Sequence, residues 1–314
     1  MEQATKKSTV VLQNLGPLLA FILLFIVVAI LNPSFIAPLN LLNLLRQVSI
    51  NGLIAFGMTF VILTGGIDLS VGSTLALSSA LMAGMIVAGL NPILAIVLSA
   101  LIGALLGAVN GLFITKGKVA PFIATLATMT IYRGLTMVYT NGNPITGLGD
   151  NLAFQLFGRG YFLGIPVPAI TMVITFFILW FILHKTSFGR KTYAVGGNEK
   201  AALVSGIKVD RVKWLIYSLA GLLAALAGSI LTSRLNSAQP TAGTSYEMDA
   251  IAAVVLGGTS LSGGKGRIFG TLVGALIIGT LNNGLNILGV SSFYQQVVKG
   301  VVILIAVLID RKKS

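Results

Sequence analysis

The chain offers few side chains with which an enzyme could do covalent or acid–base chemistry. It has no cysteine, one histidine and 8 Asp and Glu residues among 314. Without cysteine there is no thiolate nucleophile, thiolate metal site or disulfide. The histidine, His184, follows an apolar run and precedes Lys185, which is typical of a polar residue at a helix end. Neither a zinc site nor a glycosidase-type acid pair can be assembled, so we predict no metal, no cofactor and no hydrolytic centre.

One glycine-rich string is similar to a phosphate-binding loop but lacks its hydroxyl group. It is GGKG at residues 263–266. A Walker A loop requires G-x-x-x-x-G-K-[S/T], in which the Ser or Thr binds Mg²⁺. Here Thr259 occupies the first glycine position and Gly266 occupies the hydroxyl position. We therefore expect no nucleotide site in this chain, and any ATP-driven step needs another subunit.

Asp68 is an ionisable residue in an otherwise apolar part of the chain. It lies in the string GGIDLS at residues 65–70, between two apolar runs. A carboxylate at membrane depth is costly and usually faces a cavity or a partner. Two roles are open, pairing with a cation or capping a helix that starts at Ser70 or Val71. Arg133 and Lys299 are comparable cases, although Lys299 could instead extend to the membrane surface.

The elements that must position these residues are apolar helices. Hydrophobic residues make up 55% of the chain and charged residues 9%, against about 25% charged in soluble domains. Mean hydropathy is +0.95, and runs of about 20 apolar residues can cross a hydrocarbon core. The glycine-rich run 248–263 is short enough to be re-entrant. We predict an all-α polytopic membrane protein with about ten spans, at 15–31, 48–64, 71–90, 92–115, 119–139, 161–183, 213–232, 248–263, 268–288 and 292–309.

The distribution of basic residues predicts how the chain is oriented. Lys and Arg number 21 against 8 Asp and Glu, a net charge of +13. With ten spans and a cytoplasmic N-terminus, 16 basic residues fall in cytoplasmic segments, three outside and two within spans. This positive-inside asymmetry places both termini in the cytoplasm. We therefore interpret the excess charge as an orientation signal in the bacterial cytoplasmic membrane rather than as a nucleic-acid site. The 16 include Lys6, Lys7, Arg311, Lys312 and Lys313.

The segments between the spans are too short for a soluble domain, so residues 1–314 are predicted to form a single transmembrane domain. The predicted outer loops 140–160 and 233–247 are polar and rich in Gly, Pro and Asn, as turns and docking surfaces are. The predicted inner loop 184–212 is the longest and most basic connection. It is the candidate contact for a cytoplasmic partner.

Two pairs of similar strings suggest that the chain consists of two related halves. The first pair is GGIDLSVG at 65–72 and GGTSLSGG at 257–264. The second pair is GAL with NGL at 103–105 and 110–112, and again at 274–276 and 283–285. In the predicted topology the first pair implies parallel halves and the second implies inverted halves. One span is therefore misassigned, or one match is a coincidence.

Several glycines recur at helical spacing within the predicted spans. Gly103, Gly107 and Gly111 are four residues apart, as are Gly270 and Gly274. Stripes of small residues let membrane helices approach closely. We predict that these glycines serve helix packing.

A short amphipathic helix ended by Gly206 is predicted within the inner loop. Its sequence, Lys200-Ala201-Ala202-Leu203-Val204-Ser205-Gly206, resembles the E-A-A-x-x-x-G coupling segment of binding-protein-dependent ABC importers. Lys200 stands where that pattern has Glu, and Glu199 lies one place earlier. The alternative is a solvated basic loop. If the resemblance holds, Glu199, Lys200, Ala201, Ala202 and Gly206 would contact the ATPase.

Longer strings resemble the permease subunits of ribose ABC importers, within the binding-protein-dependent monosaccharide permeases, over nearly the whole chain. The resemblance implies a permease that acts as a dimer with an ATPase subunit and an extracytoplasmic ribose-binding protein. The strings are GMTFVILTGGIDLSVG (57–72), PFIATLATMTIYRGLTMVYT (121–140), AVGGNEKAALVSGIKV (194–209), NSAQPTAGTSYEMDAIAAVVLGGTSLSGGKGRI (236–268) and LNNGLNILGVSSFYQ (281–295).

A sugar would need a path lined by polar side chains that exchange hydrogen bonds with it. The alternative role of the asparagines is hydrogen bonding between helices. Two other classes of transporter also remain open, an ion-coupled transporter that uses Asp68 and a passive polyol or water channel. The candidate path residues are Asn51, Thr59, Asp68, Asn110, Asn283 and Asn286.

Overall fold

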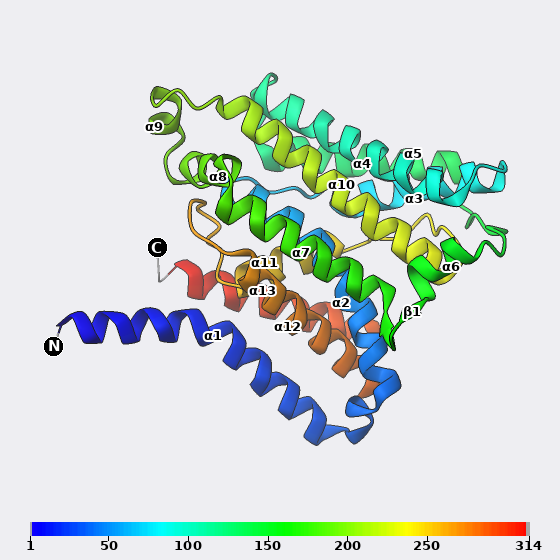
Figure 1. The fold of residues 1–314 in the computed structure, drawn as a ribbon, viewed down its shortest axis with the longest axis horizontal. Coiled ribbons are helices and arrows are strands. Elements are labelled where there is room, and N and C mark those ends of the chain that lie inside the picture. Colours follow the sequence, from blue (N-terminus) through cyan, green and yellow to red (C-terminus); the bar gives the residue numbers. More distant parts are fainter. Residues whose placement is uncertain (1, 312–314) are drawn as a thin grey trace.

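The computed structural model describes residues 2–311, with side chains described for 16–305, 307 and 308. Lys6, Lys7, Arg311, Lys312 and Lys313, all predicted to be cytoplasmic, lie outside the described side chains. The elements, drawn in Figure 1, are α1 (Glu2–Leu31), the 3-10 helix η1 (Pro33–Ile36), α2 (Pro38–Leu63), α3 (Val71–Val87), α4 (Pro92–Thr115), α5 (Pro121–Thr140), α6 (Leu152–Arg159), β1 (Tyr161–Phe162), β2 (Ile165–Pro166), α7 (Val167–Lys185), α8 (Ser187–Gly197), α9 (Glu199–Val204), α10 (Val209–Leu235), α11 (Tyr246–Leu256), α12 (Ile268–Ile287) and α13 (Ser292–Arg311).

Proline and asparagine set many of the helix boundaries. The helices α2, α4, α5 and α7 each carry proline in the first turn, where its missing N–H costs no helical hydrogen bond. Asn91, Asn151 and Asn198 cap α4, α6 and α9 with their side chains. Asn141 and Asn236 end α5 and α10 in the left-handed conformation, which asparagine tolerates.

Five of the described helices, α2, α4, α7, α10 and α12, are long and apolar enough to cross a membrane. Shorter apolar segments occur at 16–31, 71–87 and 292–305. The predicted span 248–263 is not one continuous helix, because α11 has 11 residues and ends at Leu256. At about 1.5 Å per residue, α11 covers roughly half of a hydrocarbon core.

Two other boundaries differ from the prediction. The predicted span 161–183 begins at Val167, because residues 161–166 form an antiparallel hairpin. The predicted span 48–64 begins ten residues earlier, at Pro38, since a helix can hold polar residues such as Asn40 and Arg46 where they find partners. The outer segment 140–160, predicted as a loop, contains α6.

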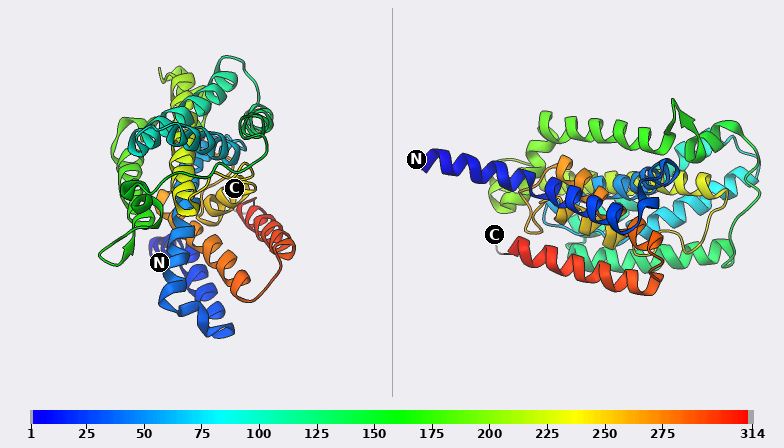
Figure 2. Two further views of the ribbon diagram at one scale, coloured as in Figure 1. Left: turned by 90° about the vertical axis from the view of Figure 1, so that its right-hand side faces the viewer. Right: turned by 90° about the horizontal axis from the view of Figure 1, so that it is seen from below.

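The long helices run in roughly the same direction or its opposite, so the molecule has two distinct ends (Figure 1). The helices α8 and α9, the start of α1 and the end of α13 lie at one end, which we call the α9 end. The helix α6 and the β1–β2 hairpin lie at the other end, the α6 end (Figure 2).

The centre of the bundle is built from α2 and α10. Every residue of α2 from Gly52 to Leu63 is buried, and Tyr217 of α10 is almost completely buried. The helix α4 packs on α10 at backbone distance, since a Cβ atom on Gly107 would collide with the carbonyl oxygen of Tyr217 and one on Gly221 with that of Gly103. The predicted packing role of Gly103 and Gly107 is confirmed.

The second predicted glycine stripe also packs against backbone. Added Cβ atoms on Gly270 and Gly274 of α12 would collide with the carbonyl oxygens of Gly257 and Ala253. Ala253 lies in α11, and Gly257 follows its last residue. The helix α12 therefore holds the half-length helix α11 in place.

One order of elements occurs twice along the chain. The order is a long helix, an irregular segment, a shorter helix and two further helices. The first series consists of α2, residues 64–70, α3, α4 and α5. The second series consists of α10, residues 236–245, α11, α12 and α13. The contacts correspond as well, because α4 packs on α10 and α12 packs on α2. The second pair of similar strings lies on α4 and α12, which hold the same place in the two series. The first pair instead lies on segments that meet near the α9 end, where Gly264 N donates to Leu63 O at 2.9 Å.

We expect Gly107→Val to lower the unfolding temperature of the purified chain, because α4 and α10 would have to separate. Overpacking of this kind costs ~1–3 kcal/mol. Gly134→Val is the matched control, since Gly134 is a helical glycine with no atom within 4 Å of an added Cβ. Equal unfolding temperatures for the two variants would contradict the packing role of Gly107.

Candidate functional site

The two shorter helices α3 and α11 meet near their N-termini, inside the bundle. A Cβ atom on Gly72 would collide with the carbonyl oxygen of Gly243, and one on Gly243 would lie 2.5 Å from the carbonyl oxygen of Gly72. Gly243 also has φ +71°, which favours glycine. The two backbones therefore touch with no side chain between them. Irregular backbone at membrane depth is tolerated only where protein buries it or a cavity adjoins it.

Asp68 lies just before the start of α3 and bonds the N-cap residue of that helix, Ser70. Its side chain is 1% exposed, and one carboxylate oxygen accepts hydrogen bonds from Ser70 N at 2.9 Å and Ser70 Oγ at 2.7 Å. Asn110 of α4 donates to Ser70 Oγ at 2.7 Å. A carboxylate at a helix N-terminus is stabilised by the free amides and by the helix dipole. Among the described ion pairs, none involves Asp68.

The start of α11 carries a buried ion pair. Asp249 is 3% exposed, and its carboxylate lies 3.0 Å from Lys299 Nζ of α13. Asn282 of α12 donates to the same carboxylate oxygen at 3.3 Å. Lys299 therefore pairs with a carboxylate inside the bundle, which connects α11 to both of the helices that follow it.

Arg133 holds the irregular segment that leads into α11. Its Nη1 donates to the carbonyl oxygens of Pro240 at 2.7 Å and Ala242 at 2.8 Å. These carbonyls lie outside any helix and need a donor in place of water. The two basic residues predicted within spans thus both reach the entrance of α11, Arg133 from α5 and Lys299 from α13.

The structure brings only two of the six candidate path residues together, Asp68 and Asn110. Thr59 Oγ1 lies 2.7 Å from Thr271 Oγ1, joining α2 to α12. Asn283 exchanges two hydrogen bonds of 3.0 Å with Asn40. Thr59 and Asn283 thus form hydrogen bonds between helices, which is the alternative to lining a sugar path.

The other two path candidates lie on α12 and α2. Asn286 is exposed and accepts a hydrogen bond from Gln295 at 2.8 Å. Asn51 is half-buried in the middle of α2. Sequence reasoning missed Asp249, although it carries the same signal as Asp68, a carboxylate inside an apolar run.

The candidate coupling segment folds as a short helix at the α9 end. Asn198 caps α9 by accepting from Ala201 N at 3.0 Å, and Glu199 pairs with Lys213 at 2.7 Å. Ala202 is buried, while Lys200 and Ala201 are exposed. Gly206 ends the turn with φ +81°. Two apolar side chains of this helix are also exposed, Leu203 by 64% and Val204 by 89%.

A basic groove adjoins this helix. It has a volume of about 500 Å³ and is lined by Lys191, Lys208 and Arg211 together with the apolar side chains of Phe188 and Leu215. Tyr193 of α8 donates to Gly266 O at 2.8 Å and so ties α8 to the loop before α12. Burial raises the pKa of Tyr193 above its ordinary value, against the opposing charge of Arg267, which keeps the phenol protonated as a donor.

Comparison with known proteins identifies relatives along nearly the whole chain. Residues 40–307 match the family described as the permease component of branched-chain amino acid transport systems. The chain is 80% identical to the ribose import permease protein RbsC of Bacillus subtilis, over 97% of this chain and 94% of that protein. It is 57% identical to RbsC of Escherichia coli K12, over 95% and 93%, and 44% identical to the D-allose transport system permease protein AlsC of the same strain, over 93% and 90%. No solved structure matches this chain.

We expect Lys299→Met to destabilise the chain, because Asp249 would be left as a buried charge without its partner. Breaking a buried pair costs ~3–5 kcal/mol, and the effect here should fall near the lower end, since 23% of the Lys299 side chain is exposed. The measurement is thermal unfolding, with the double variant Asp249→Asn/Lys299→Met expected to recover part of the loss.

The control is Lys118→Met, which removes an exposed partner from the Lys118–Asp210 pair and should change stability little. Strictly additive effects of Asp249→Asn and Lys299→Met would show that the two residues do not depend on each other.

Proposed function

This chain belongs to the permease family of branched-chain amino acid transport systems, and from that premise we infer that it is the membrane-spanning permease subunit of an ABC importer for ribose. The description of the family names another substrate, so the sugar is inferred from the relatives. The observation that supports ribose as the substrate is the 80% sequence identity to a ribose import permease over 97% of the chain. The identity to a D-allose permease is 44%. The protein is a multi-pass protein of the cell membrane.

The α9 end is the cytoplasmic end in this proposal. The basic residues of segment 184–212 occur at the end of α7, on α8 and α9, in the turn after α9 and at the start of α10, all at that end of the bundle. The positive-inside asymmetry supports this orientation. It also places both termini in the cytoplasm and directs α6 and the hairpin to the outside, where an extracytoplasmic ribose-binding protein would dock.

The two series of elements are two halves of inverted orientation. In support, α3 and α11 face each other with their N-termini in contact, and the paired contacts of α4 with α10 and α12 with α2 are those that a two-fold relation would produce. Transporters built this way place their broken helices near the membrane midplane, at the interface of the repeats. The sugar path is proposed to pass close to this junction.

A second copy of the chain would cover the flank formed by α5 and α13. Both helices carry a basic residue that reaches the junction. Each also exposes large apolar side chains, Leu135 and Val138 on α5 and Val297 and Val301 on α13. Lys299 keeps part of its side chain exposed, which is costly against lipid. A second permease copy relieves that cost and would enclose a path between the two subunits.

The ATPase subunit is proposed to dock on α9 and on the basic groove beside it. The helix presents Leu203 and Val204 to solvent at an end that lies outside the membrane, where exposed apolar side chains mark an interaction site. Lys191, Lys208 and Arg211 in the groove suit acidic groups on the partner. Closure of the ATPases would then move α9. Because Glu199 of α9 pairs with Lys213 of α10, this movement would reach α10.

The proposal is tested by ribose uptake into vesicles that contain the purified chain. We expect uptake only when the ATPase subunit, the binding protein and ATP are all present, and we expect it to persist with an uncoupler. Accumulation of ribose by the chain alone on an ion gradient would contradict the proposal and favour the ion-coupled transporter.

The coupling role of α9 is tested at Gly206. Its φ of +81° makes Gly206→Val strained by ~1–2 kcal/mol, although an added Cβ would meet no atom within 4 Å. We expect membrane insertion to remain and sugar-stimulated ATP hydrolysis by the reconstituted complex to fall.

Gly197→Val is the matched control for that substitution, because Gly197 lies in the same segment, has equal space and lacks a positive φ. Normal ATP hydrolysis in Gly206→Val would remove α9 from the coupling mechanism.

A further inference from the structure

The helix α1 separates from the bundle at its proline. Towards the α6 end, α1 packs against α12, where an added Cβ on Gly284 would lie 2.9 Å from Val28 Cγ1. Pro17 lies inside α1, and proline removes a helical hydrogen bond and bends the helix. On the N-terminal side of Pro17 the helix projects beyond the bundle (Figures 1 and 2). A gap between α1 and the start of α12 is the consequence.

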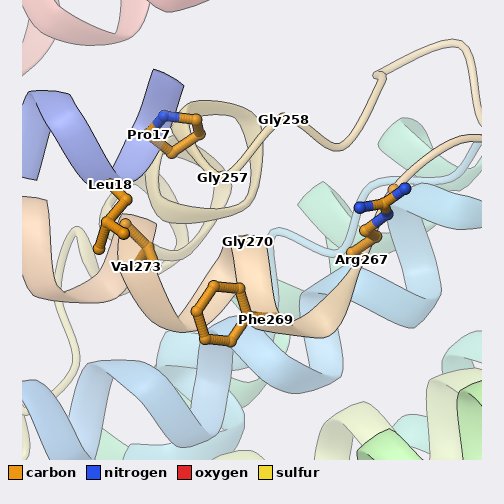
Figure 3. Close-up of a pocket in the computed structure, with 9 residues that line it drawn as sticks. Pro17, Leu18, Gly257, Gly258, Arg267, Phe269, Gly270 and Val273 are labelled. Carbon is orange, nitrogen blue, oxygen red and sulfur yellow. The ribbon is translucent and has the colours of Figure 1, made fainter. Parts of the chain in front are cut away.

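A cavity of about 140 Å³ occupies this gap. Figure 3 shows Pro17 and Leu18 of α1 on one side, Arg267 and Phe269 on the other, and glycines of the α11–α12 region between them. The cavity lies near the α9 end, where the apolar part of α1 begins at Gly16. Its depth therefore corresponds to the boundary between lipid headgroups and acyl chains.

The polar side of the cavity carries the positive charge of Arg267. Arg267 is exposed, and among the described residues it has no ion pair. No side chain caps the first turn of α12, which begins at the next residue. These groups suit an anion with several acceptor oxygens.

Apart from Arg267, the side chains that line the cavity form an apolar wall. Leu18, Phe269 and Val273 belong to it, and Phe269 is 53% exposed. A free anion would gain nothing from this wall, whereas a lipid has both a charged headgroup and an acyl chain. Basic pockets between membrane helices on the cytoplasmic side are suited to anionic headgroups. We propose that this cavity binds one anionic phospholipid, with Arg267 on the phosphate and the acyl chain along Leu18 and Phe269.

The bound lipid would contact the loop that joins α11 to α12. Gly266 of that loop accepts the hydrogen bond from Tyr193 of α8, and Gly264 donates to Leu63 at the end of α2. Headgroup binding thus stabilises a loop to which both α8 and α2 are attached. This inference goes beyond the transport function and rests on the proposed orientation, in which the α9 end faces the cytoplasm.

The test is a lipid titration of the purified full-length chain in a neutral detergent, followed by thermal unfolding. Phosphatidylglycerol should raise the unfolding temperature in a saturable way, while phosphatidylcholine should not. Arg267→Gln should raise the half-saturating concentration of phosphatidylglycerol about fivefold, the effect of one basic residue at an anionic surface. Lys265→Gln is the matched control, since Lys265 is exposed on the same loop but does not line the cavity, and it should leave the titration unchanged.

A second variant, Leu18→Trp, fills the cavity from the opposite wall and should also weaken the titration, so the result does not depend on how well Arg267→Gln folds. Equal effects of the two lipids, an unchanged titration in Leu18→Trp or Arg267→Gln, or equal losses in Arg267→Gln and Lys265→Gln would each overturn the proposal. Stabilisation by millimolar inorganic phosphate alone, to the extent seen with phosphatidylglycerol, would replace the lipid by a free anion and also overturn it.

Discussion

Backbone amide and carbonyl groups inside a membrane must find their hydrogen-bond partners within the protein, and this chain meets that demand at two places where its helices break. At residues 64–70, Asp68 accepts from the backbone and side chain of Ser70. At residues 236–245, Arg133 donates to two carbonyls that no helix satisfies. Asp68 and Arg133 are therefore explained first by the broken backbone, which has to be maintained before any path can exist.

Close packing makes these breaks possible. The irregular segments stay buried because the helices around them approach at backbone distance, through Gly107 and Gly221 between α4 and α10, and through Gly274 between α12 and α11. The contact of Gly72 with Gly243 is of the same kind. Glycine therefore has a structural role here that accounts for much of its frequency. Where helices do not meet closely, as at Pro17 of α1, a cavity remains.

The sequence predicted the helical class and the short helix before Gly206 well, and the interior less well. Hydropathy located the long helices because a run of about 20 apolar residues has few other uses. It overestimated the length of α11, since Gly257 and Gly258 end that helix inside an apolar run. It missed α6 and the hairpin at 161–166, because both are shorter than the window of about 11 residues in which a periodic pattern can be recognised. The start of α2 lies earlier than predicted because polar residues such as Asn40 and Arg46 interrupt its apolar run, and the start of α7 lies later because the hairpin precedes it.

Composition and local pattern by themselves determined that the chain is a helical membrane protein, and longer strings indicated its family. Those properties depend on residue type and on short-range order, which hydropathy and motifs record directly. Only the tertiary structure decided which polar residues meet. Asp249 pairs with Lys299 across 50 residues, and Asn283 bonds Asn40 across 243. Such pairs form because helices distant in sequence are brought together by packing, and a single sequence does not encode that proximity in any local signal.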